Sequence, residues 1–399
     1  MGAHATAGGM NDHEAPAALA AAALTAAVKQ EALRIGFDLV GVVPAVAPAT
    51  LTGFHEWLHK GFDGEMGYLS RREEAYAHPR HVLPAVRSIV MLAANYRTAD
   101  PAPPAALSGR VSRYAWNDGD YHGLIRQRLA KLADFLHAQR PGCRTRGVVD
   151  TAPLLERDFA RAAGLGWFGK NTMLINKRQG SWIFLAGLLT DVDLEPDAPH
   201  ETSHCGTCTR CLEACPTQAF PEPYVLDARK CIAYLTIELD GPIPPVLREG
   251  VGEWLFGCDI CQDVCPWNKK SPLKDDAAFR PRPDLNPADL MMLLDLDEEA
   301  FWRQFGQSAL SRPGRAGVLR NAAIVLGNQR DERAVPALCR SLFDADPLIR
   351  GAAAWALGNI GGPPALAALK SRHCVEDNSN VSFEIEQAIA ACPTRSSWG

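Results

Sequence analysis

The sequence predicts three structural regions in succession: an α/β domain, a small region organised by cysteine, and an all-α repeat domain. Three observations predict this order. Short apolar runs alternate with helical patterns up to residue 200, eight of the twelve cysteines then fall between positions 205 and 265, and a period of 31 residues follows. We place the boundaries at 1–14 for a disordered tail, 15–200 for the α/β domain, 201–270 for the cysteine-rich region, 271–311 for a linker with connecting helices, and 312–399 for the repeats.

The composition is that of a folded, water-soluble protein. Hydrophobic residues make up 47% and charged residues 22% of 399 positions, which suits two or three domains. The net charge of −5 offers nucleic acid no overall attraction, so such a partner would bind at a local patch. The closest approach to an apolar span, 15–28, is expected to be the first helix. We expect a cytoplasmic monomer with no membrane partner.

Four short apolar runs bounded by glycine, proline or aspartate predict the strands of the first domain. Between them, residues 121–140 have the i, i+3, i+4 spacing of an amphipathic helix. A proline-rich loop is expected at 100–109, and 194–204 leads out of the domain. The predicted strands are 37–45, 88–96, 145–153 and 181–191.

The first cysteine cluster has the spacing C-x2-C-x2-C-x3-C-P, formed by Cys205, Cys208, Cys211, Cys215 and Pro216. Bacterial ferredoxins hold 4Fe-4S clusters with this spacing, where three thiolates bind one cluster and the fourth binds another. Zinc sites instead use close pairs of cysteines separated by a longer span. Without a secretion signal, clustered cysteines also indicate metal ligation and not disulfides. The spacing therefore predicts iron–sulfur clusters in a ferredoxin-like domain.

A second cysteine run supplies the remaining ligands. Cys258, Cys261 and Cys265 precede a proline, but Val264 stands where a ferredoxin has its third cysteine, and Cys231 is the other cysteine of the region. The count closes at two sets of four thiolates. We assign one cluster to Cys205, Cys208, Cys211 and Cys265, and the other to Cys215, Cys231, Cys258 and Cys261. The four scattered cysteines at 143, 339, 374 and 392 are expected to be core or surface residues.

The last region contains a repeat. The segment "AAIVLGN" at 322–328 recurs as "AAWALGN" at 353–359, and 334–340 matches 365–371 at the same offset. This period, with two helices in each unit, indicates stacked helical pairs of the HEAT type. Residues 381–392 are expected to be a closing helix, and 271–287 a proline-rich connector.

Two motifs of the first domain leave alternatives open. The segment "GLGWFG" at 164–169 matches a dinucleotide-binding pattern but follows a helical segment where a strand is required, so we expect a tight loop whose Lys170 and Asn171 bind a cofactor or cap the turn. Asp150 follows an apolar strand and precedes Pro153, which suits either a helix N-cap or a general acid. Tyr121 and His122 are explained by capping and packing alone.

Taken together, the motifs resemble those of the epoxyqueuosine reductases, a cobalamin- and iron–sulfur-dependent family of tRNA queuosine synthesis. The resemblance runs from about residue 30 to the end and rests on "GFDLVGV", "GFDGEMGYL", "VDTAPLLER", "GLGWFGKNT", "GSWIFLAGLLTD", "CIAYLTIE", "GCDICQDVCPWN" and "LRNAAIVLGN". One departure concerns an arginine that the family often has before a proline, where this chain has Tyr76, Ala77 and His78. The contact is then lost, or supplied by Arg71, Arg72 or Arg80.

The resemblance implies reduction of an epoxide on a modified tRNA base to an alkene, with loss of water. The clusters would pass electrons from an external low-potential donor to cobalamin. Asp150 would be the proton donor, because an epoxide oxygen leaves poorly until it is protonated. The residues implied to line the cobalamin region are Tyr121, His122, Asp150, Gly169, Lys170, Asn171 and Ser181.

Seven arginines between 312 and 350 outnumber four acidic residues there and suggest a docking face for the tRNA, the alternative being an ordinary solvated helix surface. They are Arg312, Arg315, Arg320, Arg330, Arg333, Arg340 and Arg350. Two other functions remain open: a reductive dehalogenase acting on a small organohalide, and a ferredoxin-like electron carrier without catalysis. The repeat region argues against the first, and the large α/β domain against the second.

Overall fold

The computed structural model describes residues 20–103 and 105–392, so the tail predicted at 1–14 lies outside the described residues. The first helix, α1, spans Ala21–Ile35 and therefore runs seven residues further than the predicted 15–28. Its buried stripe continues through Val28 to Ala32. Lys29 does not end the helix, because its ammonium pairs with Asp197 at 2.6 Å. Gly36, with φ of 109°, closes it in the left-handed conformation.

The first domain is built on a four-stranded sheet in which every neighbouring pair is antiparallel. The order is β1 (Leu39–Pro44), β2 (Ser88–Asn95), β7 (Ile183–Thr190) and β4 (Thr145–Val148). All four predicted strands are present. Strand β4 is shorter than the predicted 145–153, because the chain turns out of the sheet before Asp150.

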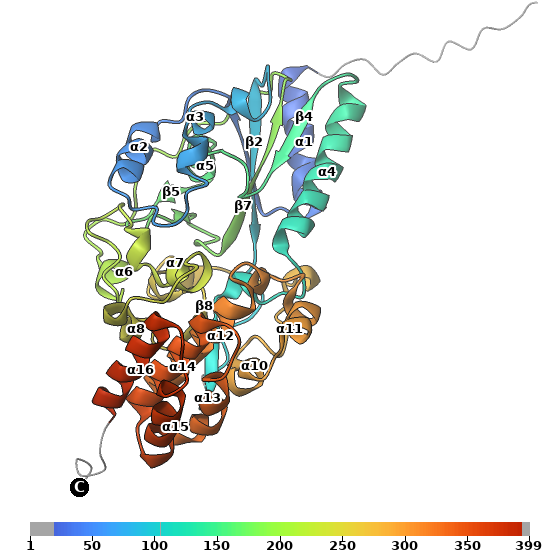
Figure 1. Cartoon of the computed structure of the whole chain (residues 1–399). Helices are drawn as coiled ribbons and strands as arrows, with labels where there is room; N and C mark the ends of the chain where they lie inside the picture. The colour runs from blue at the N-terminus through green and yellow to red at the C-terminus, as the bar shows by residue number, and fades with distance from the viewer. Residues whose placement is uncertain (1–19, 104, 393–399) are drawn as a thin grey trace, which may run out of the picture.

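Helices cover both faces of this sheet (Figure 1). On one face, α1 and α4 (Tyr121–Gln139) pack against Val90 and Leu92 of β2. On the other, α5 (Glu156–Ala162) packs against Ile89 and Met91. Alternate residues of β2 thus point to opposite cores, as the period of two in a strand requires. The remaining helices of this half are α2 (Leu51–His59) and α3 (Glu73–Tyr76).

A second sheet joins the predicted α/β region, the cysteine-rich region and the linker. Its order is β8 (Trp254–Phe256), β3 (Ser108–Val111) and β9 (Ala288–Asp289). The prediction of a loop over 100–109 is therefore wrong at its end, where β3 begins. The central strand belongs to the predicted α/β region, whereas its neighbours belong to the cysteine-rich region and the linker. One hydrophobic core accordingly extends from β3 through β8 into the repeat helices.

The cysteine-rich region has short helices and little sheet. Its helices are α6 (Arg210–Glu213), α7 (Ile232–Ile237), α8 (Pro245–Val251) and α9 (Ile260–Asp263). The segment "GLGWFG" leads into a small antiparallel hairpin, β5 (Trp167–Phe168) and β6 (Leu174–Ile175). This hairpin excludes a dinucleotide-binding unit at 164–169, which would need a helix directly after the glycines.

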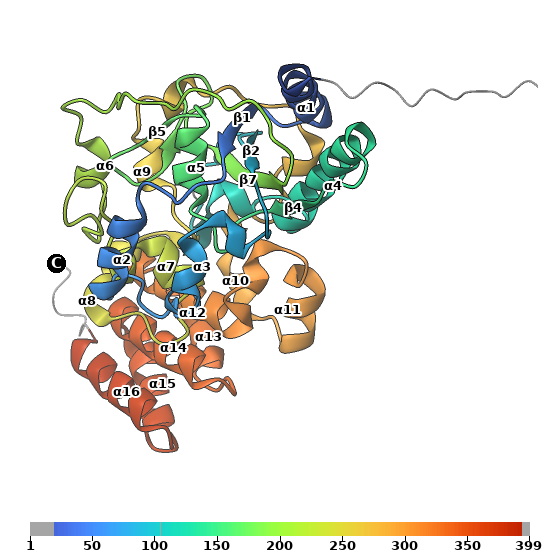
Figure 2. The same cartoon turned by 90° about the horizontal axis from the view of Figure 1, so that it is seen from above.

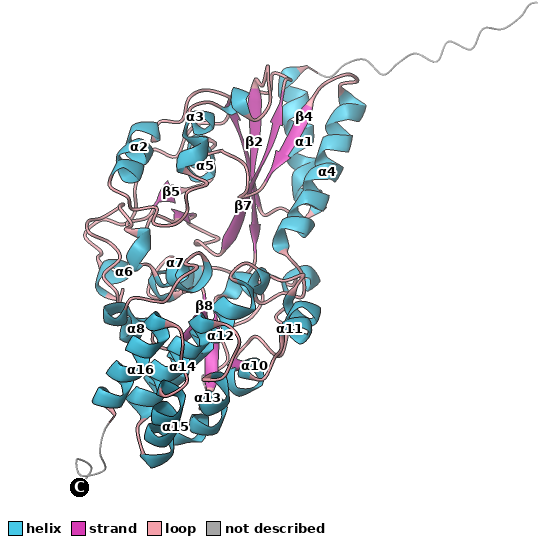
Figure 3. Cartoon of the chain, viewed as in Figure 1, coloured by secondary structure: helices cyan, strands magenta, loops and turns pink. Residues whose placement is uncertain are grey.

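The C-terminal end is helical (Figures 2 and 3). After α10 (Leu290–Leu294) and α11 (Glu298–Phe305) come the repeats, which are α12 (Gly314–Gln329), α13 (Val335–Ser341), α14 (Pro347–Ile360), α15 (Pro363–His373) and α16 (Ser379–Ala391). The repeated "LGN" has a packing reason. A Cβ on Gly327 would lie 2.9 Å from the Cα of Ala356, and one on Gly358 would lie 2.7 Å from the Cα of Ala388. Each glycine thus lets the next repeat helix approach.

Among the helices described over 20–392, none combines the length and the apolar character needed to cross a membrane.

Candidate active site and cluster-binding loops

Asp150 lies in the turn between β4 and α5, with φ of +56°. This left-handed conformation is uncommon for residues other than glycine, and asparagine and aspartate tolerate it best. The interpretation of Asp150 as a helix N-cap is wrong, because α5 begins only at Glu156 with Leu155 as its N-cap. The Asp150 amide instead donates to Glu156 Oε1 at 2.7 Å. The Asp150 side chain is 64% exposed, so its carboxylate is accessible from outside.

Two residues at the start of α4 contact this carboxylate. The Tyr121 hydroxyl donates to Asp150 Oδ2 at 2.7 Å, and His122 Nε2 lies 3.5 Å from the same oxygen. On its other side, His122 Nδ1 lies 2.6 Å from Asp120 Oδ1, and Asp120 also caps α4. The Tyr121 ring stacks between His122 and Phe184 of β7, with both centroid distances 4.1 Å. The expected capping is therefore present, and in addition the cap residues face Asp150.

The charges of this group follow from its contacts. The adjacent His122 and the hydrogen bond from Tyr121 hold the pKa of Asp150 below its usual value. Burial lowers the pKa of His122, but its contacts with Asp120 and Asp150 outweigh burial and raise it to about 9. Burial and the charge of Asp150 raise the pKa of Glu156 to about 8. At neutral pH the site therefore holds a carboxylate, an imidazolium and a neutral carboxyl group.

Other side chains influence the charge around Asp150, and two of them, Tyr68 and Glu156, were not singled out from the sequence. Burial, with a contribution from the Asp150 charge, raises the pKa of Tyr68 to about 12 and also raises that of Tyr76 and Tyr114. These tyrosines stay neutral and present hydroxyl groups. Tyr68 and Glu156 lie within motifs that carried the family resemblance, but nothing in their spacing predicted that they lie near Asp150.

Two arginines hold the loop that carries Asp150. Arg72 donates to the Thr151 carbonyl oxygen at 3.0 Å, and Arg126 reaches the Thr151 hydroxyl at 3.5 Å. Of the three arginines considered as replacements for the one missing before Pro79, Arg72 is thus in contact with the active-site loop. His78 is engaged locally, since its Nδ1 accepts from the Arg80 amide at 3.1 Å.

The other residues implied to line the cofactor region are next to the cysteine loops. Lys170 Nζ donates to the Gly206 carbonyl at 2.8 Å, and Asn171 Nδ2 donates to the Cys261 carbonyl at 3.3 Å. The Ser181 hydroxyl is buried and accepts from Asn268 Nδ2 at 2.9 Å. A Cβ on Gly169 would lie 2.5 Å from Asn171 Oδ1. The structure therefore separates the predicted set into a part at Asp150 and a part at the cysteines.

Four cysteines line one cavity, and they are those assigned to the first cluster: Cys205, Cys208, Cys211 and Cys265. The cavity volume is about 40 Å³, and the cavity is partly open to solvent. Trp167, which is 2% exposed, packs with Cys205 and Cys265, and its indole N–H has no hydrogen-bond partner among the described residues. An unpaired buried donor beside thiolates fits a site whose cluster sulfurs accept hydrogen bonds.

The other four cysteines also influence one another as a set. Burial raises the thiol pKa of Cys258, and so do the neighbouring Cys261 and Cys231. Burial likewise raises the pKa of Cys231, to which Cys215 adds. Buried thiolates without compensation are costly, whereas iron deprotonates its thiol ligands outright. These couplings place Cys215 beside Cys231, and Cys231 beside Cys258 and Cys261, as the predicted second set requires. The division of the eight ligands stays a prediction, because Cys261 is also coupled to Cys211 of the first set.

The ligand geometry differs from that of a single ion. Over residues 20–103 and 105–392, no group of three or more His, Cys, Asp or Glu side chains is close enough to hold one metal ion. Four thiolates on one zinc ion would have to converge at about 2.3 Å from it. A 4Fe-4S cube instead gives each iron its own thiolate and keeps the four apart.

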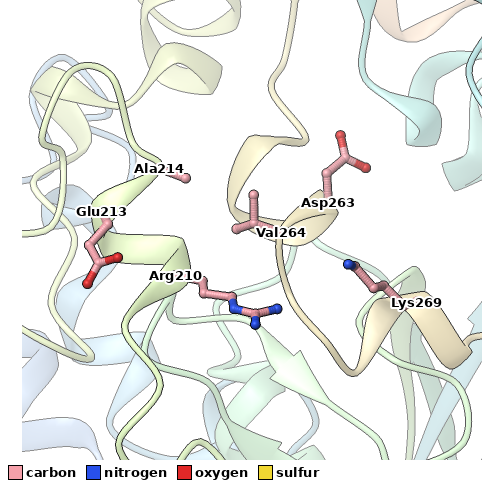
Figure 4. Close-up of a pocket in the computed structure, with 6 residues that line it drawn as sticks. All are labelled: Arg210, Glu213, Ala214, Asp263, Val264 and Lys269. Carbon is pink, nitrogen blue, oxygen red and sulfur yellow. The ribbon is translucent and has the colours of Figure 1, made fainter.

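A hollow of about 490 Å³ opens between α6 and α9 (Figure 4). Arg210 and Glu213 line one side, and Asp263, Val264 and Lys269 line the other. The charges balance in number, and Asp263 is paired inward with Arg113 at 2.8 Å. Ala214 and Val264, which also line it, directly precede Cys215 and Cys265. Solvent thus approaches closely the region between the two cysteine sets.

Two of the seven arginines predicted to form a docking face are buried and do not contribute to one, whereas for the exposed arginines the docking face stays a prediction. Arg320 is 1% exposed and donates to backbone carbonyls, and Arg350 is buried against Glu376. Four others form ion pairs, which are Arg312–Glu238, Arg315–Asp344, Arg333–Asp331 and Arg340–Asp295. Arg330 forms no ion pair with any of the described residues. Three of the acidic partners lie outside residues 312–350, so a local count of charge could not reveal the neutralisation.

The fold and the site define a class: a two-cluster iron–sulfur oxidoreductase in which an α/β domain carries an exposed acid–base group and a HEAT-like domain closes the chain. Family models agree. Residues 77–151 match one described as epoxyqueuosine reductase QueG, DUF1730; 204–268 match a 4Fe-4S double cluster binding domain; and 308–390 match HEAT repeats. The predicted fold class is thereby confirmed.

Relatives identify the family. The epoxyqueuosine reductase of Salmonella typhimurium is 40% identical over 334 residues, covering 83% of this chain and 86% of that protein. A solved epoxyqueuosine reductase with an epoxyqueuosine-modified stem loop of tRNA-Tyr has a TM-score of 0.87 at 33% identity, covering 92% of this chain and 98% of that one. A structure from Bacillus subtilis, with its catalytic aspartate loop swung out of the active site, has a TM-score of 0.84 at 33% identity over 93% and 99%. The chain belongs to the epoxyqueuosine reductase family.

Proposed function

We propose that this protein reduces epoxyqueuosine to queuosine at the wobble position of a tRNA anticodon, using cobalamin fed by two 4Fe-4S clusters. The reaction removes the epoxide oxygen as water and so consumes two electrons and two protons. Bound cobalamin would supply low-potential electron transfer at the substrate ring. The observation that carries the proposal is the exposed carboxylate of Asp150, held by Tyr121 and His122 in a chain that also carries two sets of four cysteines.

The cysteines would hold the clusters in the two sets described above. Cys205, Cys208, Cys211 and Cys265 share one cavity, which opens to solvent and suits entry of electrons. Among the other set, Cys261 contacts the Asn171 side chain through its carbonyl oxygen, and Asn171 belongs to the predicted cofactor-lining residues. Asn171 also lines the cavity of the first set, so this loop would connect both sets to the cofactor wall. The hollow between α6 and α9 gives an external low-potential donor access to the region between the sets.

The residues implied to line the cobalamin region would act in two ways. Tyr121, His122 and Asp150 present side chains at the open site. Asn171 and Ser181 already use their side chains on the cysteine loops, so they would shape the cofactor wall and fix the distance to the clusters. Gly169 would let the backbone pack closely against Ile175, because a Cβ there would lie only 2.5 Å from the Ile175 side chain. Lys170 would hold the loop to Gly206 through its hydrogen bond to the Gly206 carbonyl.

Asp150 would protonate the epoxide oxygen as its C–O bond breaks. An alkoxide is a poor leaving group, and a positioned acid lowers this barrier by about 10²–10⁴-fold in rate. The exposed position of Asp150 on a turn after β4 lets it reach a substrate from outside. The mobile catalytic aspartate loop of the Bacillus subtilis enzyme supports the same role here. Strain at φ of +56° is typical of residues whose position is set by function.

The tRNA would bind by shape and through phosphates, with the modified base inserted toward Asp150. The solved relative with a modified tRNA stem loop supports this substrate. Arg72 and Arg126, which border the Asp150 loop, supply positive charge beside the site. A cytoplasmic monomer remains the expectation for this chain.

The deciding experiment combines anaerobically reconstituted protein, cobalamin, a low-potential reductant and tRNA carrying epoxyqueuosine, followed by nucleoside analysis. We expect queuosine. Turnover of a small organohalide without turnover of tRNA would favour the dehalogenase alternative. Cluster reduction and reoxidation by other proteins, without either turnover, would favour the electron carrier.

A further inference from the structure

We propose that His122 is the proton reservoir of the active site: it holds the proton that Asp150 passes to the substrate oxygen, and Asp120 keeps it in the charged form. This inference rests on the proposed function and assigns a source to its protons. His122 contacts Asp120 on one ring nitrogen and faces Asp150 with the other. It is thus a positioning residue that stores a proton and acts through Asp150, and not only a residue that packs on Tyr121.

The stoichiometry of the reaction demands such a reservoir. Removing the epoxide oxygen as water forms two O–H bonds at one atom, while the electrons that leave with each broken C–O bond are replaced by the reductant. A single carboxyl group carries one proton and must be reloaded before the second transfer. In addition, the contacts of Asp150 hold its pKa below the usual value, so it is a carboxylate at neutral pH. A carboxylate can conduct a proton but does not store one.

The atoms form a continuous route. Asp120 Oδ1 lies 2.6 Å from His122 Nδ1, and His122 Nε2 lies 3.5 Å from Asp150 Oδ2. At 3.5 Å the second contact is an ion pair and not a hydrogen bond, and the buried Nε2 has no hydrogen-bond partner among the described residues. The side chains of Asp120 and Asp150 are 48% and 64% exposed, whereas that of His122 is 18% exposed. Solvent therefore reaches both carboxylates, whereas the imidazole between them is largely shielded.

Each transfer balances. The Nε2–H bond of His122 breaks as an O–H bond forms on Asp150, and that O–H bond breaks as the substrate oxygen is protonated. Loss of that proton leaves a neutral imidazole that keeps its hydrogen on Nδ1, and Nε2 regains a proton from solvent through the exposed carboxyl group of Asp150. The oxygen freed from an epoxide is a far stronger base than imidazole or carboxylate. The overall transfer from His122 to that oxygen is therefore downhill.

The other groups at the site serve different roles. Burial raises the pKa of Tyr121, so its hydroxyl keeps its proton and orients Asp150. Glu156 accepts from the Asp150 amide and therefore fixes the backbone of the turn. The cations Arg126 and Arg157 lie near Asp120 and Asp150 and lower their pKa further. Among the charged neighbours in the described part of the chain, Asp120 contacts Nδ1 of His122 and Asp150 faces Nε2.

The first test requires no turnover. Ring resonances of the eleven histidines are followed against pH by NMR in the full-length protein, and His122→Gln identifies the signal of His122. We expect His122 to titrate near 9, and Asp120→Asn to lower its proton affinity by at least tenfold, because the negative charge beside Nδ1 is lost. Titration near the ordinary value of about 6.5 would overturn the proposal whatever the enzyme catalyses.

The second test measures turnover. Because His122 carries its proton below about pH 9, the rate of the wild-type protein should be level below that pH and fall above it, and Asp120→Asn should move the fall to lower pH. His122→Gln should slow turnover about 10²–10⁴-fold, with partial rescue by imidazole buffer. His137→Gln, at the far end of α4 and 3.0 Å from the Thr145 hydroxyl, is the matched control. An unchanged pH profile in His122→Gln, or slowing that imidazole cannot relieve, contradicts the reservoir. Absence of turnover in every form tests the proposed function instead, and the NMR result still decides the reservoir.

Discussion

The cysteine loops and the Asp150 site are both assembled from several segments, but only the cysteine loops can be recognised from residue spacing in the sequence. Seven of the eight cluster cysteines lie in two runs with fixed spacing, and the short helices α6 and α9 lie within those runs. The Asp150 site combines the start of α4, the turn after β4, and Tyr68 and Tyr76 from the segment around α3. Each of these residues is ordinary in its own segment. Local cysteine spacing therefore predicts the cluster ligands, whereas the grouping of side chains around Asp150 becomes visible only in the folded structure.

The largest expected effect is the loss of one iron–sulfur cluster, and it tests the ligand assignment made from cysteine spacing. Cys231 is the one ligand outside both runs, and Cys231→Ala should reduce the content from about eight irons to about four in each chain after anaerobic reconstitution. Iron and sulfide analysis with cluster absorbance measures this. Cys339→Ala, on α13 in the repeat region, is the control and should keep all the iron. Full iron content in Cys231→Ala would show that the assignment of the two sets is wrong.

The next effect concerns the assembled site. Asp150→Asn should slow epoxide reduction by about 10²–10⁴-fold while cluster content is unchanged, because the amide cannot relay a proton. Single-turnover analysis of nucleosides with pre-reduced enzyme separates this chemical step from electron supply. Asp134→Asn, on the exposed face of α4, matches the chemical change away from the site. A normal rate in Asp150→Asn would leave the aspartate a purely structural part of its turn.

The same contrast explains what the sequence could predict. The four strands of the large sheet, the α4 helix, the repeats and the grouping of the cysteines follow from local pattern and counting. The strand β3 does not, because four residues after a proline-rich stretch pair with β8 more than 140 positions away. The antiparallel order of the large sheet and the position of Glu156 beside Asp150 likewise depend on long-range packing.

The arginines of the repeat region show the limit most clearly. Arg320 is surrounded by carbonyl oxygens of residues 235, 239 and 241, which belong to the cysteine-rich region. Its charge therefore joins two regions of the chain and is not available to a tRNA. Charge near Asp150 is placed for chemistry, whereas charge among the repeat helices stabilises the fold.

A buried ion pair in the repeat region tests that distinction. Glu376 has a fully buried side chain that receives two hydrogen bonds from Arg350 and a further one from Arg372. These contacts lower its pKa to about 2. Glu376→Gln should lower the free energy of unfolding by about 3 kcal/mol at pH 7, because Arg350 is left buried without its partner. Urea denaturation measures the change, with the half-exposed Glu386→Gln as the control.

The pH dependence of that effect has a definite sign. A carboxylate whose folded pKa is depressed stabilises the protein above its unfolded pKa of about 4.5, and the contribution is lost as pH falls toward about 2. The stabilities of the wild-type protein and Glu376→Gln should therefore converge across this range. A constant difference would mean that the variant loses packing and not charge.

The smallest effect separates two glycines of one helix. A Cβ on Gly358 of α14 would lie 2.7 Å from the Cα of Ala388, so Gly358→Ala must push α16 away and should lower the free energy of unfolding by about 1–3 kcal/mol. A Cβ on Gly351 of the same helix would meet only the Glu384 side chain, at 3.9 Å. There, alanine should raise stability by about 0.5–1 kcal/mol, because it restores helix propensity without a collision. Opposite signs in urea denaturation would establish that the repeated "LGN" encodes helix contact. Equal changes would mean that the glycine recurs for a reason other than packing.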